Sequence, residues 1–390
     1  MEELGKFPLD GVRVIELAHI ASGPFCGMLL GDLGADVVKI EPPGGEHLRK
    51  WPPFVGSGEG RLSTQFASLN RNKRSIEADL KNPADLAMVA NLINRADVVI
   101  ENFRPGVLDR LGLGYKTVTK GHRGLVYCSI SGFGQTSPYR TKGAFDIIIQ
   151  AMSGLMSVTG ERGRSPVKSG VPFGDFVPGL YAAYTIVAML PRARAGDSSY
   201  IDVPMLDCLL ATSPLRTSEY FGTGEIPTHI GNEHPTNVPY QSFEASDGHF
   251  VVGAGNDRLW RKLCEAIGFP KLADEPRFAT QEKRVMRRLE LTEQLQAIFI
   301  RQPKAAWLQA IESRGVPCGP INNFAEILND RHVRETELLL NVDVPGGTVP
   351  TVAFPCRSDR FGKRYVKGPP KVNAGRDSVL SDWGIRTEVP

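Results

Sequence analysis

Cysteine is sparse in this 390-residue chain: its six cysteines form no C-x-x-C pair and have no histidine at ligand spacing. We therefore expect buried free thiols, with no disulfide framework and no bound metal. Long hydrophobic runs are also missing, since no segment approaches the roughly 20 apolar residues that span a bilayer. Residues 1–10 carry Glu2 and Glu3 and lack the apolar core of a signal peptide. We expect a cytoplasmic protein that does not bind membranes.

An excess of one charge is missing as well. The chain has 46 basic and 43 acidic side chains, a net charge of +3, which disfavours a nucleic-acid partner. Hydrophobic residues make up 41% and charged residues 23%, as is typical of globular proteins. The length is enough for two or three compact units of roughly 100 to 200 residues each.

The first third of the chain alternates strand and helix patterns. Apolar runs that predict buried strands are separated by segments with helical spacing, which is typical of a parallel sheet covered on both faces. The expected strands are residues 12–17, 36–41, 97–103 and 125–131, and the expected helices are residues 24–33 and 83–96.

The rest of the chain predicts more helix and a second unit. Residues 144–190 are mostly helical around a Gly/Ser/Arg-rich loop, with a helix from 178 to 190, and residues 223–239 have the composition of a domain boundary. We predict an α/β fold with a large domain (1–222), a small α/β domain (223–330) and a C-terminal segment (331–390) that returns to the large domain. The small domain should contain a strand at 249–253 and helices at 258–267, 287–299 and 304–314, and the tail from 342 should be strand and turn.

The first strand and helix suggest a dinucleotide site, but the glycines do not fit one. Gly23, Gly27 and Gly31 recur every fourth residue in the helix, where they allow close packing, whereas G-x-G-x-x-G places its glycines in the turn. Glu41 could imitate the acid that binds ribose. A nicotinamide-dependent enzyme stays an alternative, although its phosphate-binding pattern is missing.

Two polar segments could bind a nucleotide. The first, NRNKR at residues 70–74, is either a solvated surface run or a phosphate clamp. The second, at residues 102–105, follows a strand where ligands bind parallel sheets. Its amide, aromatic ring and guanidinium suit a nucleotide, while Pro105 alone fits a plain turn into a helix.

Asp175 lies between Gly174 and Phe176, before an apolar helix. Its simplest role is that of an N-cap whose carboxylate accepts the free amide hydrogens of the first turn. A carboxylate held in this way would be rigid, ionised and approachable, as a nucleophile must be. The two roles are compatible.

Several long segments resemble the class III CoA-transferase family, which includes formyl-CoA:oxalate CoA-transferase and α-methylacyl-CoA racemase. The resemblance implies a Rossmann-like large domain and a small domain, in a homodimer whose two chains interlock like rings. The segments that carry it are residues 8–41 with Arg49, 70–81, 96–113, 132–175 and 201–207, with further matches at 231–240, 253–257 and 315–320.

The resemblance also implies the site residues. It assigns Asp175 as the catalytic nucleophile and CoA as a substrate carrier, with no permanently bound cofactor. Family contacts with CoA fall on positions that match Ile20, Ala21, Ala78, Leu80, Lys81, Asn102, Phe103, Arg104, Arg110, Gly143, Ala144, Phe145 and Asp146.

Departures from the family pattern narrow the activity. Pro42 stands where formyl-CoA transferases have Arg, Ala21 replaces a Gln beside their active site, and their glycine-rich loop is missing after Gly231. Oxalate and formyl-CoA are therefore not the expected substrates. The racemases need a His at the position of Phe145, which cannot move a proton.

The expected function is transfer of CoA from an acyl-CoA donor, succinyl-CoA, to a free dicarboxylate through an aspartyl anhydride and an aspartyl-CoA thioester. His19 and His234 are candidates to bind the second carboxylate of the acid. The alternatives are a 2-methylacyl-CoA racemase or epimerase, a nicotinamide enzyme, and a protein that only binds acyl-CoA.

Overall fold

The structure is a computed structural model and describes residues 7–56, 58, 61–122, 124–344, 347–359 and 366–385. The chain forms two compact units. The large unit comprises Met1–Leu155, Lys168–Gly224 and Arg334–Pro390, and the small unit comprises Met156–Val167 and Glu225–Val333. Residues 156–167 group with the small unit, although the sequence analysis placed them in the large domain.

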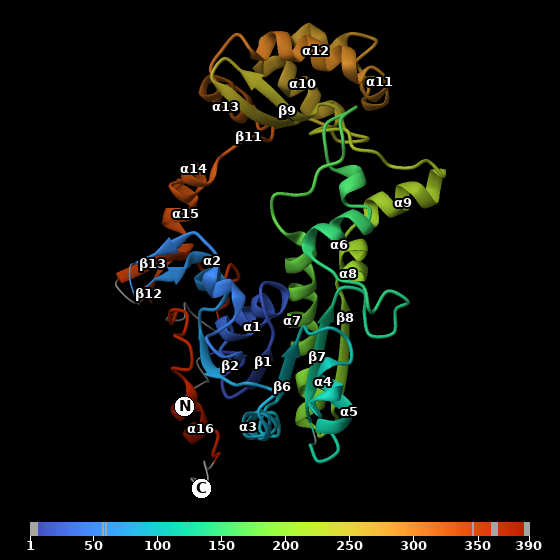
Figure 1. Ribbon diagram of the computed structural model, residues 1–390. Coiled ribbons are helices and arrows are strands. Elements are labelled where there is room, and N and C mark those ends of the chain that lie inside the picture. The colour runs from blue at the N-terminus through green and yellow to red at the C-terminus, as the bar shows by residue number, and fades with distance from the viewer. Residues whose placement is uncertain are drawn as a thin grey trace. The chain divides into compact units, whose positions relative to one another are not determined.

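A six-stranded parallel sheet forms the centre of the large unit (Figure 1), in the order β5-β2-β1-β6-β7-β8. The parallel sheet predicted from the sequence is confirmed, but β5, which coincides with part of the NRNKR run, was not foreseen. The strands are β1 (Arg13–Leu17), β2 (Asp36–Glu41), β5 (Lys73–Glu77), β6 (Val98–Glu101), β7 (Val126–Ser131) and β8 (Ser199–Pro204).

Successive side chains of β1, β2, β6 and β7 enter two separate apolar cores, one on each face of the sheet. On one face, Val14 and Val98 pack with residues of α1 (Ser22–Asp32) and α7 (Phe173–Arg194). On the other face, Ile15 and Val99 pack with α3 (Pro83–Ile93) and α16 (Arg376–Asp382). Each fully buried aliphatic side chain contributes about 1.5–3 kcal/mol, which explains why these four strands are largely apolar.

Helices α1 and α7 pack closely against each other beside the sheet. Gly179 permits this approach, because a Cβ atom there would lie 2.8 Å from the Ser22 carbonyl oxygen. By length and composition α7 could cross a membrane, a test that the core helix of a globular protein also passes. The sequence analysis expected no such segment. In the large unit α7 also packs on β7 and β8.

The remaining elements of the large unit are short. They include an antiparallel hairpin, β12 with β13, in the C-terminal segment, where the sequence analysis expected strand and turn but not α16. These elements are η1 (His47–Lys50), β3 (Phe54–Val55), β4 (Leu62–Ser63), α2 (Thr64–Leu69), α4 (Val107–Arg110), α5 (Tyr115–Val118), α6 (Asp146–Met152), α8 (Met205–Ala211), α9 (Pro214–Thr223), β12 (Leu339–Val344) and β13 (Gly347–Val352).

The small unit is an antiparallel sheet covered by helices, in the strand order β11-β10-β9. Phe299 is at the centre of its core, with ring contacts to Phe243, Phe250 and Trp307. The elements from Glu225 to the return of the chain are β9 (Tyr240–Ala245), β10 (Gly248–Gly253), α10 (Asp257–Ala266), η4 (Pro270–Asp274), α11 (Gln281–Met286), α12 (Arg288–Phe299), α13 (Lys304–Ser313), β11 (Cys318–Pro320), α14 (Phe324–Leu328) and α15 (Arg331–Glu335), and η3 (Met156–Val158) lies in the earlier segment.

All six cysteines are free thiols, as expected from their spacing. Cys26, Cys128, Cys208 and Cys264 are buried. Cys318 is half-buried and Cys356 is exposed, so the expectation of burial was wrong for the last of them.

Candidate active site

A cavity of about 280 Å³ lies at the carboxyl ends of β1, β6 and β7, beside the first turn of α7. Ligands of open α/β sheets bind at this edge. Ten of the residues expected to act as nucleophile or to contact CoA line it: Ile20, Ala21, Asn102, Phe103, Arg104, Gly143, Ala144, Phe145, Asp146 and Asp175. All of them belong to the large unit.

Four of the expected CoA contacts do not line this cavity. Ala78, Leu80 and Lys81 follow β5, which lies two strands from β1 along the sheet. Arg110 ends α4, which begins shortly after β6. His19, the candidate for binding the second carboxylate, also lines the cavity, whereas Ser22, Arg140, Lys142 and Met205 were not predicted from the sequence.

Asp175 is the third residue of α7, not its cap. The helix begins at Phe173, with Pro172 at the N-cap position and no side-chain cap, so the expected N-cap role is wrong. The Asp175 carboxylate makes no hydrogen bond with any residue that the structure describes. Burial, together with the charge of Asp146, raises its pKa from 3.8 to about 7. The expected hold of the carboxylate by amide hydrogen bonds is therefore also wrong, and the raised pKa disfavours its ionised form below pH 7.

Asp146 supports the backbone next to Asp175. It is the first residue of α6, and its Oδ1 accepts a hydrogen bond of 2.9 Å from the Gly174 amide. The buried Gln150 side chain donates to both Asp146 oxygens, at 3.0 and 2.8 Å, and accepts the Ser169 amide at 2.9 Å. Asp146 thus fixes the start of α7, a role that no local sequence pattern indicates.

The loop after β1 is fixed at three successive residues. Lys39 Nζ donates to the Ala18 carbonyl at 2.7 Å. Asn102 accepts the His19 amide and donates to the His19 carbonyl, both at 2.9 Å. Ile20 has a left-handed backbone (φ 67°), and its amide donates to Glu46 Oε2 at 2.8 Å. This hydrogen bond holds a conformation that a β-branched residue rarely adopts.

A fully buried charge cluster lies beneath this loop. Lys39 contacts Glu16 at 2.9 Å and Glu46 at 2.8 Å, and Lys73 contacts Glu16 at 2.8 Å; all four side chains have no exposed surface. Burial lowers the pKa of Lys39, but the neighbouring carboxylates outweigh it and raise the pKa overall. Burial lowers the pKa of Lys73 to about 8. Gly27 makes room for the cluster, because a side chain there would collide with the Glu16 carboxylate.

The cations of the NRNKR run are internal, so both interpretations of this run were wrong. Arg71, only 5% exposed, forms two hydrogen bonds with Asp32 at 2.9 and 2.6 Å. Lys73 belongs to the buried cluster, and Arg74 pairs with Asp36 and Asp382. Since carboxylates already bind all three cations, the run is neither a solvated surface nor a phosphate clamp.

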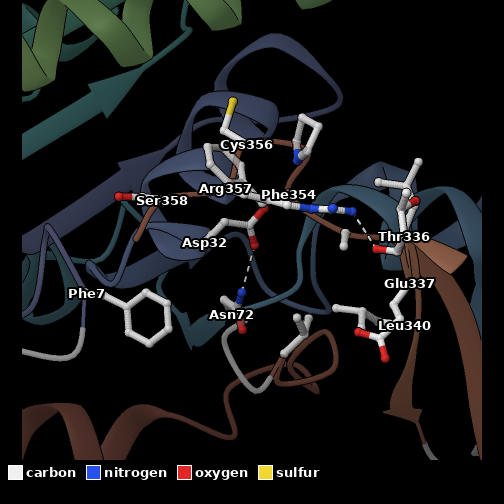
Figure 2. Close-up of a pocket in the computed structure, with 14 residues that line it drawn as sticks. Phe7, Asp32, Asn72, Thr336, Glu337, Leu340, Phe354, Cys356, Arg357 and Ser358 are labelled. Carbon is white, nitrogen blue, oxygen red and sulfur yellow. Dashed lines mark hydrogen bonds between the residues drawn. The ribbon is translucent and has the colours of Figure 1, made fainter. Parts of the chain in front are cut away.

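A second cavity, of about 250 Å³, lies where the C-terminal segment meets the large unit's own N-terminal part. Figure 2 shows Asn72 donating to Asp32 on one side, at 2.8 Å, and Arg357 donating to the Thr336 carbonyl on the other, at 2.6 Å. None of the residues assigned to the catalytic or CoA site lines this cavity.

The two candidate histidines belong to different units. His19 lines the cavity with Asp175, and its ring packs edge-on to Phe103 at 5.3 Å. Burial lowers the pKa of His19 below 6.5. His234 lies in the small unit, where its Nδ1 accepts the amides of Thr236 and Asn237 at 3.2 Å each.

Three cations, Arg104, Arg140 and Lys142, line the cavity. None of them forms an ion pair with a residue that the structure describes; Lys142 Nζ lies 4.0 Å from the ring centre of Tyr139. In the described part of the chain no three metal-binding side chains come together. The site thus combines an unpaired carboxylate with unpaired cations, which suits an anionic substrate with an electrophilic carbon.

The chain belongs to CoA-transferase family III, whose family model matches residues 9–376. It is therefore an enzyme of the CoA-transferase class. It is 40% identical over 383 residues to the succinate–glutarate CoA-transferase of Agrobacterium fabrum, covering 97% of this chain and 96% of the relative. It is 40% identical to the succinyl-CoA:mesaconate CoA-transferase of Haloarcula hispanica, covering 97% of each. A CAIB/BAIF family protein from Brucella suis has a similar structure, with a TM-score of 0.88 and 38% identity, covering 97% of this chain and 100% of that one.

Proposed function

We propose that this enzyme transfers CoA from succinyl-CoA to a free dicarboxylate, with Asp175 as the nucleophile. The observation that carries the proposal is the Asp175 carboxylate, which lines the cavity at the sheet edge without a hydrogen-bond partner among the described residues. The choice of donor and acceptor is supported by the names of the two relatives, which act on succinate or succinyl-CoA and on glutarate or mesaconate.

The proposed reaction consists of four acyl transfers. One Asp175 oxygen attacks the thioester carbonyl of the donor, the C–S bond breaks, and CoA thiolate leaves a mixed anhydride on the enzyme. The thiolate then attacks the aspartyl carbonyl and releases the donor acid, which gives an aspartyl-CoA thioester. The acceptor carboxylate repeats the two steps in reverse order and restores Asp175. Protons are neither gained nor lost, and each step exchanges bonds of similar energy.

The surroundings of Asp175 are suited to this chemistry. Each step builds a tetrahedral oxyanion, and we propose that backbone amides of the glycine-containing segments at Gly132 and Gly143 stabilise it. The low polarity around the carboxylate, which its raised pKa reflects, limits hydrolysis of the anhydride by keeping water out. No permanently bound cofactor enters the scheme.

We propose that the three unpaired cations, Arg104, Arg140 and Lys142, bind the phosphates of CoA. Guanidinium groups match phosphate oxygens in pairs, and Lys adds a point charge. The remaining family positions, including the segment at Ala78 and the end of α4 at Arg110, lie toward the same side of the large unit, since they follow β5 and β6. They are proposed to contact the more distant parts of the nucleotide.

We propose that the two units are the two domains of an interlocked homodimer that works in the cytoplasm. Large apolar side chains on the surface support a partner chain: Leu215, Phe221 and Phe324 are each 80% exposed. A mass twice the 42.6 kDa of the chain, measured by sedimentation, is expected. A monomer at micromolar concentration would contradict the dimer without affecting the proposed chemistry.

A panel of CoA thioesters mixed with free acids, followed by mass spectrometry, tests the activity. Exchange without net loss of thioester is expected, with succinyl-CoA and dicarboxylates reacting fastest. When the acceptor carries ¹⁸O in its carboxyl group, label should appear in Asp175, because its oxygens pass through the anhydride. Epimerisation of a 2-methylacyl-CoA, reduction of a nicotinamide, or CoA binding without exchange would each refute the proposal.

A further inference from the structure

His19 is the polar ring of the cavity that has no polar partner. It stands at the carboxyl end of β1 and lines the cavity together with Asp175. Its ring nitrogens form no hydrogen bond with any residue that the structure describes, whereas those of His122, His229 and His234 have oxygen or amide partners. A half-buried donor without a partner is available to a ligand.

The position of His19 is fixed before any ligand arrives. Asn102 holds both its amide and its carbonyl, and the neighbouring residues are tied to the buried charge cluster through Lys39 and Glu46. The Phe103 ring packs edge-on against the imidazole, with 5.3 Å between the two ring centroids. A donor fixed in this way loses little freedom on binding, so its hydrogen bond contributes more fully to affinity.

The charge state of His19 suits hydrogen bonding to a carboxylate. Burial lowers its pKa, so at neutral pH the ring is uncharged and offers one N–H donor. His19 and Asp175 line the same cavity, so one small acid could contact both side chains.

We propose that the imidazole N–H of His19 binds the second carboxylate of the acid whose first carboxylate reacts at Asp175. This inference rests on the proposed function and specifies the substrate class. Donor and acceptor acids occupy the same place in turn, so one subsite serves the distal carboxylate of a succinyl group and that of the accepting dicarboxylate. A hydrogen bond from a neutral donor to a carboxylate is charge-assisted and hence stronger than a neutral one.

The test compares glutarate with pentanoate, which has the same chain length but lacks the second carboxylate. Succinyl-CoA is held constant as the donor. His19→Leu keeps an apolar side chain against Phe103 but removes the N–H, and His19→Asn keeps a donor. His47→Leu is the matched control, since His47 is exposed and does not line the cavity.

His19→Leu should lower the ratio of kcat/KM for glutarate to kcat/KM for pentanoate by roughly 10- to 100-fold, as expected for a lost hydrogen bond to a charged group. The loss should appear in KM for glutarate, with kcat at saturating glutarate little changed. His19→Asn should retain part of the ratio and His47→Leu all of it. If pentanoate is not turned over, its inhibition constant against glutarate replaces kcat/KM, and His19→Leu should leave it unchanged.

Two kinds of failure are distinguishable. Absence of exchange by the wild-type enzyme with every thioester and acid would refute the proposed function. The role of His19 would be overturned if the wild-type enzyme exchanges normally and His19→Leu lowers kcat/KM for glutarate and pentanoate equally. It would also be overturned if His19→Leu raises only the KM for the thioester. Circular dichroism and CoA binding check that the variants fold. If His19→Leu is unfolded, His19→Asn and His19→Gly replace it. The role of His19 would be overturned if both of these variants kept the wild-type ratio of kcat/KM for glutarate to kcat/KM for pentanoate.

Discussion

The unpaired carboxylate of Asp175 should destabilise the folded enzyme at the pH where it is most reactive. Its pKa is raised from 3.8 to about 7, so the folded protein holds the proton more tightly than the unfolded chain does. The free energy of unfolding therefore falls as the pH rises from 3.8 to 7, and the full penalty is present above pH 7. At about 1.4 kcal/mol for each pKa unit, the penalty amounts to about 4 kcal/mol.

Asp175→Asn removes this penalty because the amide has nearly the same shape and no proton to lose. Between pH 5 and pH 8, the stability of the variant relative to the wild type should increase by about 2–3 kcal/mol. For a unit of this size, the difference in Tm between variant and wild type should grow by roughly 5–10 °C over this range.

Thermal unfolding followed by circular dichroism at pH 5, 6, 7 and 8 measures the effect. Asp377→Asn, which changes an exposed carboxylate in α16, is the control and should show no such trend. A difference in Tm between Asp175→Asn and the wild type that stays constant from pH 5 to pH 8 would refute the reasoning. So would a wild type that is the more stable protein at pH 8.

Three further outcomes follow from the site. In pH profiles of wild-type kcat/KM, activity should rise with pH with an apparent pKa of about 7, since the ionised Asp175 is the attacking form. Asp146→Asn should lower this apparent pKa, but not as far as 3.8, because burial raises the pKa of Asp175 more than the charge of Asp146 does. Glu46→Ala should cost about 3–5 kcal/mol in urea unfolding, because it leaves a buried lysine with one carboxylate fewer. Arg71→Ala should lower Tm and leave KM for succinyl-CoA unchanged, because Arg71 pairs with Asp32. Arg104→Ala should raise this KM and leave Tm unchanged, because Arg104 lines the cavity. Identical effects of the two variants on Tm and KM would contradict these roles.

Much of the sheet could be predicted because its strands are buried on both faces and therefore read as apolar runs. The strand at 36–41 was located to the residue, and the turn at Asn102 was found because it follows such a strand. Strand β5 was missed because Lys73 and Arg74 give it the composition of a surface segment. Their carboxylate partners come from β1, β2 and α16, which lie far away in sequence.

The cavity was predicted less completely because its geometry depends on residues that carry no local pattern. Arg140 and Lys142 lie in an irregular loop, and nothing in the sequence indicates that they face the same cavity as Asp175. The start of α7 was placed too late, at 178 rather than Phe173, so Asp175 was taken for a cap. Its raised pKa depends on burial and on Asp146, and both are tertiary effects.

The edge of the central sheet has a consequence for biosynthesis. Strand β5 is completed on its outer side by the segment before α16: the Gly375 amide donates to the Ser75 carbonyl at 2.9 Å, and the Asn373 side chain accepts the Glu77 amide at 3.0 Å. Some 300 residues separate these partners in the sequence, so during translation β5 stays uncovered until residues 373–375 have left the ribosome. A nascent chain of this enzyme therefore presents an open strand edge while these 300 residues are synthesised, and such an edge is the surface that holding chaperones shield from aggregation.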